Sequence, residues 1–369
     1  MNTKLLYIAS TAVPAATASS VHVGRMCAAL GRSGTVVELL CKQGLDRSLE
    51  DYFGMATPFT THAVPFDSRW ALPGYLRVLE RLRSSVRVAH GRYAYGSLYC
   101  ALRGTPVSYE VHAPATGIKR QVEQRLLRNP KLLGVVAITQ ALADEYLRQY
   151  PALDGRLCVL PDAADDPGAS RLPSTSGRLV AAYAGGWYAG RGIELIVALA
   201  RAMPQIDFRL AGGSHAALGD WASGAELPPN LRAVGYLEPA RVADFLAAAD
   251  VLLAPYGRTV AANHGSSTAV LDTTRWCSPM KLFEYLAQGK AILCSALPVL
   301  QEVMRHEDNA LLVEPENLAA WVAALQRLDH DRSLAVRLAQ QARRDYLSQH
   351  SWDRRAERLL RFIRDCRNR

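Results

Sequence analysis

Lys281 and Glu284 lie three residues apart in the segment CSPMKLFEYLAQGKAILC, a spacing that places a cation and a carboxylate on one edge of a helix. The N-terminus of a helix offers unpaired N–H donors and a partial positive charge, so Lys281 beside it would complete a phosphate site. Glu284, one turn further along, has the acceptors to bind ribose hydroxyls. An ordinary surface ion pair has the same spacing, so the pattern alone does not separate the two explanations.

Residue types mark both ends of this helix. Ser278 is a good N-cap, Pro279 fits the first helical position, and Gly289 can close the C-terminus. We therefore expect a helix that opens at Ser278, runs over 280–288 and shows Gln288 on the same polar edge as Lys281.

Length and composition indicate the class of protein to which such a helix would belong. The chain has 369 residues, of which 49% are hydrophobic and 21% charged, and its length fits two α/β domains with a cleft between them. Its seven cysteines are scattered and none is in C-x-x-C spacing, which favours reduced thiols over disulfides or a zinc site. The N-terminal apolar run is too short for a secretory leader, and no run approaches a membrane span.

Short apolar runs alternate with helical stretches along the chain, the pattern of β-α units around a parallel sheet. In the first half we expect a first strand from Lys4, a helix capped near Ser19 and Ser20, and a strand Val107–Glu110. A Pro-, Gly- and Asp-rich stretch, Pro161–Gly177, reads as a linker. We predict two Rossmann-like, doubly wound domains over 1–165 and 166–350, with a final helix over 351–369 that packs back on the first domain and has Ser351 as its N-cap.

The net charge of +9 is concentrated in one segment. Between Arg69 and Lys131 there are twelve Arg or Lys residues and three Glu, so this segment accounts for the whole excess. Such a patch attracts phosphate-bearing partners, for example an anionic lipid surface or a diphosphate-linked acceptor, and a solvated helix face explains it equally well. Because the segment lacks interleaved aromatics and a recognition motif, we expect no nucleic-acid partner.

SPMKLFEYLAQGKAILCSALPVLQEV closely resembles the nucleotide-binding helix of GT-B glycosyltransferases, specifically the retaining family 4 group. AYAGGWYAGRGIELIVALARAMPQIDFRLAGG resembles the first strand, Gly-rich turn and helix of that family's second domain. The first half matches through SSVHVGRMCAALGRSG, GTPVSYEVHAP and VVAITQALADEYL. The resemblance extends over most of the chain in the same order, and it implies the GT-B fold and a nucleotide-sugar donor.

In the second domain, the resemblance implies a complete donor site. Glu284 would bind the ribose, and Ser278, Pro279 and Met280 would lie against the diphosphate or the sugar. The Gly-rich turn contributes Gly185 and Gly186, and of the Arg and Lys that the family carries there, Gly186 occupies the first place and Arg191 the second. We expect Lys281 to replace the missing Arg. Trp276 stands where the family has a Glu that contacts the sugar, so the sugar is left open.

In the first domain, the resemblance singles out His112, which follows the strand Val107–Glu110 and would contact the donor sugar. A residue at the carboxyl end of a strand in a doubly wound sheet favours that function over a structural one. His22, in SSVHV, has similar standing but a weaker position. Arg92, in HGRYAYG, resembles a strand-end Arg of this group that would touch the acceptor or a phosphate, and an ordinary basic surface residue is the alternative. Glu302, near a second helix start in the other domain, is expected to organise the loop around the nucleotide or to cap that helix.

These features predict a metal-independent glycosyltransferase with no cofactor, because two cations suffice at the diphosphate and the chain has no Asp-x-Asp triplet. The acceptor would be a glycan or a lipid-linked glycan, used in the cytoplasm or at the inner face of the plasma membrane, in bacterial surface polysaccharide or glycolipid synthesis. Two alternatives stay open: a sugar-nucleotide epimerase of the same fold, and a non-catalytic module that binds nucleotide sugars or anionic lipids.

Overall fold

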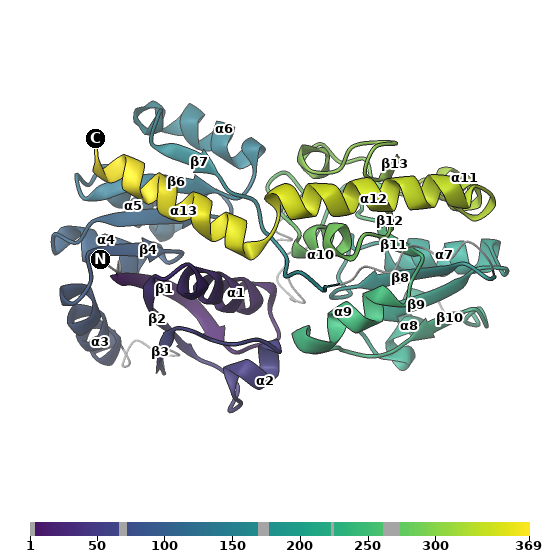
Figure 1. Ribbon diagram of the computed structural model, residues 1–369, viewed down its shortest axis with the longest axis horizontal. Coiled ribbons are helices and arrows are strands. Elements are labelled where there is room, and N and C mark those ends of the chain that lie inside the picture. Colours follow the sequence, from purple (N-terminus) through teal and green to yellow (C-terminus); the bar gives the residue numbers. More distant parts are fainter. Residues whose placement is uncertain (1–3, 66–71, 169–176, 223–224, 261–273) are drawn as a thin grey trace. The chain divides into compact units, whose positions relative to one another are not determined.

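The computed structural model describes residues 4–65, 72–168, 177–222, 225–260 and 274–369. They form two compact α/β units, the first containing Met1–Asp162 and Trp352–Arg369 and the second Ala163–Ser351. The chain therefore leaves the first unit and returns to it for the last helix, drawn in yellow in Figure 1. The start of the predicted linker is divided between the units, and residues 169–176 of it lie outside the described residues.

The first unit is built on a parallel sheet of seven strands in the order β3-β2-β1-β4-β5-β6-β7. Its strands are β1 (Lys4–Val13), β2 (Val36–Gln43), β3 (Thr60–Val64), β4 (Val88–Gly91), β5 (Val107–Val111), β6 (Leu132–Ala137) and β7 (Leu157–Val159). Its helices are α1 (Ala18–Arg32), α2 (Leu49–Phe53), α3 (Leu72–Ser84), α4 (Ala94–Leu102), α5 (Gly117–Leu127), α6 (Gln140–Gln149) and α13 (Trp352–Arg367). Helices α1 and α13 pack side by side (Figure 1).

The second unit has a parallel sheet of six strands in the order β10-β9-β8-β11-β12-β13. Its strands are β8 (Val180–Ala184), β9 (Asp207–Ala211), β10 (Leu231–Ala233), β11 (Val251–Ala254), β12 (Ala291–Ser295) and β13 (Leu311–Val313). Its helices are α7 (Ile193–Ala202), α8 (His215–Trp221), α9 (Pro239–Ala247), α10 (Met280–Gln288), α11 (Leu318–His330) and α12 (Arg332–Gln349).

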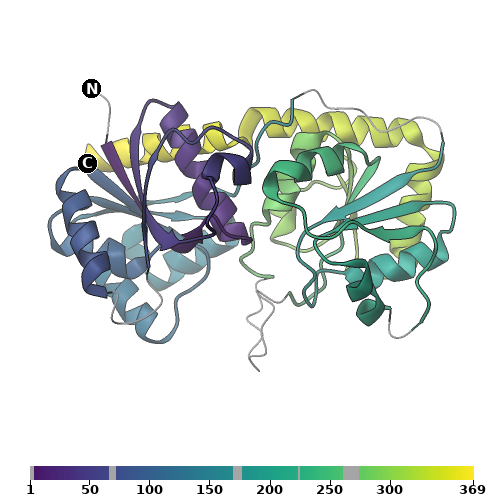
Figure 2. The same cartoon turned by 90° about the horizontal axis from the view of Figure 1, so that it is seen from below.

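Burial on both faces explains the strand sequences. Figure 2 shows helices on both faces of each sheet, and strands covered in this way become continuous apolar runs, as in VLLA of β11 and AILCS of β12. Along β8, Ala181 and Tyr183 enter one core of the second unit, whereas Ala182 and Ala184 enter the other. The predicted doubly wound α/β architecture is thus confirmed in both units.

The strand order reverses once in each sheet, between β1 and β4 in the first unit and between β8 and β11 in the second. In open α/β sheets, ligands bind outside the carboxyl ends of the strands at this switch point. The segments that follow β8 and β11, and those that follow β1 and β4, are therefore the places where each unit can build a site.

Two predicted helix starts need correction. Helix α1 is capped by Thr17, whose hydroxyl accepts from Ser20 N at 3.2 Å, so Ser19 and Ser20 lie inside the helix. Helix α10 has the predicted range and ends at Gly289, but Pro279 occupies its N-cap position and no side chain caps it. Ser278 precedes that position because the backbone of Pro279 is still extended.

Candidate active site

The Gly-rich turn after β8 lies at the switch point of the second sheet. Gly185 has a φ of +148°, and a Cβ atom there would lie 2.6 Å from Lys281 Nζ. Gly192 has a φ of +78°, and a Cβ there would lie 1.9 Å from the carbonyl oxygen of Pro255, just after β11. Both positions therefore require glycine, and the absence of side chains lets the turn lie against Lys281 and against the segment that follows β11.

Helix α10 is fixed to this place by Tyr285. Its buried hydroxyl accepts a hydrogen bond from Ala184 N at 3.1 Å and donates to Leu253 O at 3.2 Å. One side chain thus ties the helix to both strands of the switch point, β8 and β11. The first turn of α10, whose N–H groups have no partner within the helix, begins beside the turn that carries Gly185.

Arg191 and Lys281 meet around the ring of Tyr256. The guanidinium carbon of Arg191 is 5.2 Å from the centroid of this ring, and Lys281 Nζ is 5.3 Å from the same centroid. Lys281 Nζ also lies 3.7 Å from the ring centroid of Tyr183. Arg191 Nε and Lys281 Nζ are buried, and neither atom has a hydrogen-bond partner within the described part of the chain. Two buried donors without an acceptor form a site for an anion.

The protonation of Lys281 reflects these surroundings. Burial lowers the pKa of Lys281 well below 10.5, Arg191 lowers it further, and Glu284 offsets only part of the change. A diphosphate placed against both cations would reverse this effect, because an anion favours the charged form of an ammonium group.

The edge of α10 that carries Lys281, Glu284 and Gln288 is therefore at least partly buried and is not a solvated helix face. The Nζ atom of Lys281 is buried, Glu284 is half-buried, and Gln288 is buried and donates to Ala243 O at 2.9 Å. The explanation of Lys281 and Glu284 as an exposed surface pair is wrong for Lys281. Trp276, upstream of the helix, is half-buried, and the Arg275 guanidinium lies 4.7 Å from the centroid of its ring.

Four other predicted residues belong to this unit: Gly186 lies in the Gly-rich turn, Ser278 and Met280 lie at the start of α10, and Glu302 lies in a separate turn. The carbonyl oxygen of Gly186 accepts from the Tyr183 hydroxyl at 3.1 Å, which joins the turn to the ring that contacts Lys281. Ser278 and Met280 are half-buried at the start of α10. Glu302 is exposed and is the last residue of the 3₁₀ helix Leu300–Glu302, so the helix expected near it is a single 3₁₀ turn.

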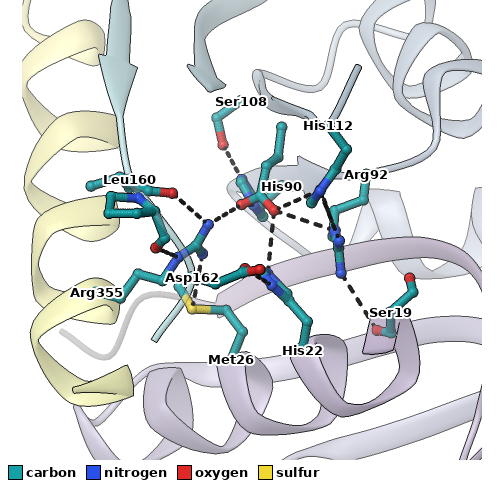
Figure 3. A network of polar contacts seen from close by, with 12 residues as sticks. Ser19, His22, Met26, His90, Arg92, Ser108, His112, Leu160, Asp162 and Arg355 are labelled. Carbon is teal, nitrogen blue, oxygen red and sulfur yellow. Dashed lines mark hydrogen bonds and ion pairs between the residues drawn. The ribbon is translucent and has the colours of Figure 1, made fainter. Parts of the chain in front are cut away.

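The first unit holds a second polar cluster, shown in Figure 3. It contains the three predicted residues His22, Arg92 and His112, which come from α1, from the end of β4 and from the end of β5. Arg92 Nε donates to His112 Nε2 at 2.8 Å. The structure thus brings together three residues that are far apart in the sequence, at the carboxyl ends of the central strands.

Glu110 is the centre of this cluster. Its Oε1 atom is 3.0 Å from His112 Nε2, 3.2 Å from His22 Nε2 and 3.3 Å from Arg92 Nε. Its Oε2 atom accepts from Arg355 Nη2 of α13 at 2.9 Å. The carboxylate has no exposed surface, so every charge around it acts with little screening by solvent.

The electrostatics of the cluster favour an ionised Glu110 and a neutral His112. Burial raises the pKa of Glu110, but Arg355 and His22 outweigh it, and the pKa lies well below the usual range. Burial and the neighbouring Arg92 lower the pKa of His112 to about 4, against the opposing effect of Glu110. His112, with a third of its side chain exposed, is therefore a neutral hydrogen-bonding group near pH 7.

Sequence reasoning missed Glu110, Asp162 and Arg355. Asp162 accepts from or shares a proton with His22 Nδ1 at 2.6 Å, and its pKa is lowered because His22 and Arg355 outweigh the effect of burial. The glutamate within the apolar strand VSYEV was a usable sign, since an acidic residue inside a buried strand needs charged partners.

The basic segment forms part of the surface of the first unit, and its first residue, Arg69, lies outside the described residues. Some of its charge is neutralised locally, because Arg83 and Arg103 both pair with Glu80. Lys119 and Arg120 are exposed at the start of α5, next to Ile118, which is 72% exposed. Across residues 4–65, 72–168, 177–222, 225–260 and 274–369, no helix is long and apolar enough to cross a membrane, and no group of three or more His, Cys, Asp or Glu could hold a metal ion.

Two family models match successive parts of the chain. The model described as Glycosyltransferase Family 4 matches residues 19–166, and that described as Glycosyl transferase-like matches residues 191–361. The chain belongs to the family 4 glycosyltransferases. The resemblance that the sequence motifs indicated is thereby confirmed over most of this glycosyltransferase, including the Gly-rich turn from Arg191 onward and α10. No curated protein has significant sequence similarity to it.

Solved structures of glycosyltransferases share the fold. Sucrose-phosphate synthase from Thermosynechococcus elongatus has a TM-score of 0.73 at 17% identity, with 99% of each chain covered. A glycosyltransferase from Rickettsia africae has a TM-score of 0.74 at 12% identity, covering 99% of this chain and 98% of the other. Anabaena HepE, in complex with UDP, has a TM-score of 0.73 at 12% identity, covering 98% of this chain and 100% of the other. At these identities the likeness establishes the GT-B fold.

Proposed function

We propose that this glycosyltransferase moves a sugar from a nucleoside diphosphate to a hydroxyl group of a glycan or lipid-linked acceptor, with retention of anomeric configuration. The observation that carries this proposal is the pair of buried cations, Arg191 and Lys281, at the switch point beside the start of α10. Helix N–H groups and two cations suit a diphosphate, and Glu284, one turn into α10, is the proposed ligand of the ribose. HepE, which shares the fold, has been solved with UDP and with UDP-glucose.

In the proposed reaction, the bond between the anomeric carbon and the terminal phosphate oxygen breaks, and a bond from that carbon to the acceptor oxygen forms. The acceptor's proton passes to an oxygen of the departing diphosphate. Charge accumulates on the diphosphate as it leaves, so Arg191, Lys281 and the dipole of α10 lower the barrier. Glu284 binds and orients the donor, with no role as nucleophile.

His112 is proposed to bind a hydroxyl group of the sugar as a neutral imidazole. Its low pKa, about 4, leaves it uncharged at neutral pH, and Arg92 holds its ring in place. A neutral ring can accept or donate a hydrogen bond to a sugar hydroxyl without competing with Arg191 and Lys281 for the diphosphate.

A thermal-shift series with UDP-, GDP-, ADP- and dTDP-sugars tests the donor site. A donor present at 100 times its dissociation constant stabilises the protein by about 2.7 kcal/mol, and Glu284→Ala and Lys281→Ala should each abolish the shift. An unchanged shift in both variants would refute the site. Transfer assays with EDTA test the proposed independence of metal, which a loss of transfer restored by Mg²⁺ or Mn²⁺ would overturn.

The class of reaction is tested by product analysis. Released nucleoside diphosphate together with a glycosylated acceptor supports transfer, and analysis of the anomeric proton of the product decides between retention and inversion. A new free sugar nucleotide formed without acceptor would instead identify an epimerase. Failure to release nucleotide with any donor and acceptor would favour a binding module.

A lipid-linked or anionic acceptor at the inner face of the plasma membrane is proposed from the surface of the first unit. Exposed Ile118, Lys119 and Arg120 at the start of α5 combine an apolar side chain with two cations. We expect vesicles rich in phosphatidylglycerol to bind the protein at low salt, and Ile118→Asp to weaken that binding. Equal sedimentation with neutral vesicles would remove the support for this acceptor class and for surface polysaccharide or glycolipid synthesis.

A further inference from the structure

The first turn of α13, which follows the whole second unit in the sequence, enters the polar cluster of the first unit (Figure 3). Trp352 is buried, with its ring centroid 5.0 Å from that of His22. Arg355, only 3% exposed, places its guanidinium between Glu110 and the segment that follows β7. The last helix thus contributes side chains to the cluster as well as covering the sheet.

Arg355 binds one carboxylate of the cluster and the backbone beside the other. Its Nη2 donates to Glu110 Oε2 at 2.9 Å, and also to the carbonyl oxygen of Leu160 at 3.1 Å. Its Nε donates to the carbonyl oxygen of Pro161 at 2.8 Å, directly before Asp162. One planar guanidinium therefore sets the orientation of Glu110 and the path of the backbone that carries Asp162.

Both carboxylates act on the histidines. Glu110 reaches His112 and Arg92 with its other oxygen, and Asp162 contacts His22 Nδ1 at 2.6 Å. Glu110 Oε1 lies within 3.3 Å of nitrogen atoms of His112, His22 and Arg92, so one buried oxygen connects these three groups. Buried ion pairs are rarely more stable than an apolar core, which argues against a purely stabilising role.

We propose that Arg355 is a positioning residue, which acts through Glu110 to hold His112 and Arg92 in their productive orientation. The proposal rests on the function proposed for His112, but its structural part can be tested without any donor or acceptor. The other groups that face Glu110 are His22 from α1, His90 from β4 and Tyr7 from β1, and a replacement of Arg355 leaves these residue types unchanged.

The decisive experiment follows the titration of His112 by long-range ¹H–¹⁵N spectra of the histidine rings. In Arg355→Met, Glu110 loses one of its two arginine partners and keeps Arg92, so more of the carboxylate charge acts on His112. The midpoint of His112, near pH 4 in the parent protein, should rise by one unit or more. The kcat of transfer should fall on the order of 10- to 100-fold, with a smaller change in KM. The acid limb of the pH–rate profile should move to higher pH.

Arg358→Met is the matched control. Arg358 lies one turn further along α13 and donates to the carbonyl oxygen of Val159 at 3.0 Å, so it also ties the helix to the sheet, but it is exposed. This variant should leave the His112 titration and kcat unchanged. An equal effect of the two replacements would show that Arg355 acts only through attachment of the helix and would overturn the proposal.

Two further variants guard against a misfolded protein. Arg355→Lys keeps a cation but loses the planar set of donors, so it should fold and give an intermediate shift and an intermediate loss of kcat. Glu110→Gln should reproduce the loss of kcat, and its combination with Arg355→Met should cost little more than either change alone, since both break one path. Additive losses, or a His112 midpoint that stays near 4 in Arg355→Lys and Arg355→Met, would refute the proposal.

Discussion

Replacement of Lys281 by methionine should change nucleotide binding and ligand-free stability in opposite directions. Methionine keeps most of the length of the side chain and its contact with Tyr183, but removes a buried ammonium whose Nζ has no hydrogen-bond partner among the described residues. Without nucleotide, burial and repulsion by Arg191 cost more than the contacts of the ammonium with the two tyrosine rings and Glu284 return, as the lowered pKa of Lys281 indicates, so Lys281→Met should raise the melting temperature. With nucleotide, the variant lacks one of the two proposed cations of the diphosphate site.

The expected loss of affinity follows from the contact that is removed. A hydrogen bond to a charged group contributes about 1.5–3 kcal/mol, which corresponds to roughly 10- to 100-fold in the dissociation constant. At a UDP concentration of 100 times the parent's dissociation constant, binding stabilises the parent by about 2.7 kcal/mol and a 100-fold weaker variant by only about 0.4 kcal/mol. If another of GDP, ADP and dTDP gives the larger shift with the parent, that nucleotide replaces UDP.

Protonation of Lys281 adds an independent measurement. Its folded-state pKa lies well below 10.5, so the unfolded chain binds more protons between these two values, and ligand-free stability should rise with pH across that window. The gain in stability of Lys281→Met over the parent should shrink as pH rises through it. Nucleotide binding should take up a proton, visible as a dependence of calorimetric binding heat on the ionisation enthalpy of the buffer, and Lys281→Met should lose this dependence.

Lys290→Met is the control, because Lys290 is a second buried lysine, just beyond the other end of α10. It should keep the parent's nucleotide-induced shift. The reasoning is refuted if Lys281→Met binds nucleotide as tightly as the parent, or if it is less stable than the parent without nucleotide while Lys290→Met behaves as expected.

Three other predictions concern single positions. Gly185→Ala should weaken nucleotide binding at least as much as it lowers stability, because its Cβ would meet Lys281 Nζ at 2.6 Å; calorimetry that shows unchanged affinity would contradict this. His112→Gln should reduce the loss of stability on acidification from pH 6.5 to 4, since the folded state disfavours protonated His112, whose pKa is about 4. Urea unfolding at each pH measures the free energy of unfolding, and an equal slope of that energy against pH in the parent and the variant would count against the assignment. Asn230→Ala should lower the free energy of unfolding by about 1–3 kcal/mol without changing nucleotide affinity, because the Asn230 amide donates to the carbonyl oxygens of Ala200, Met203 and Ile206. Urea unfolding measures this, and a change under about 0.5 kcal/mol, the size expected of an ordinary surface substitution, would be inconsistent with these bonds.

Local chemistry made the second unit predictable. Helix α10 has the expected range because Gly289 and a clear apolar stripe are short-range signals, and the strands β8, β11 and β12 are nearly continuous apolar runs. The predicted cap at Ser278 was wrong because the backbone of Pro279 is still extended, so the helix begins one residue later, at Met280. The edge strands β3, β7 and β13 were missed, because β3 (TTHAV) lacks a continuous apolar run and β7 and β13 have only three residues each.

The partners of the first-unit histidines could not be predicted in the same way. Glu110 and Arg355 are separated by 245 positions, and neither lies in a motif whose spacing points to the other. The burial of Lys281 Nζ was missed for a similar reason, because, of the aromatic rings beside it, that of Tyr183 lies in β8 and that of Tyr256 follows β11. A sequence pattern shows which residues are neighbours along the chain. The protonation of these charged groups depends instead on residues that other strands and helices bring close to them in the fold.

The return of the chain to the first unit has a consequence for biosynthesis. A ribosome makes all of Ala163–Ser351 before it reaches Trp352, so the newly made first unit exists for a time without α13. During that interval Glu110 faces no Arg355, and the face of α1 that will pack on α13 is open to other chains. The second unit, although it is made later, is continuous in the sequence and is the first that can complete its fold. Emergence of α13 from the ribosome then completes the histidine cluster.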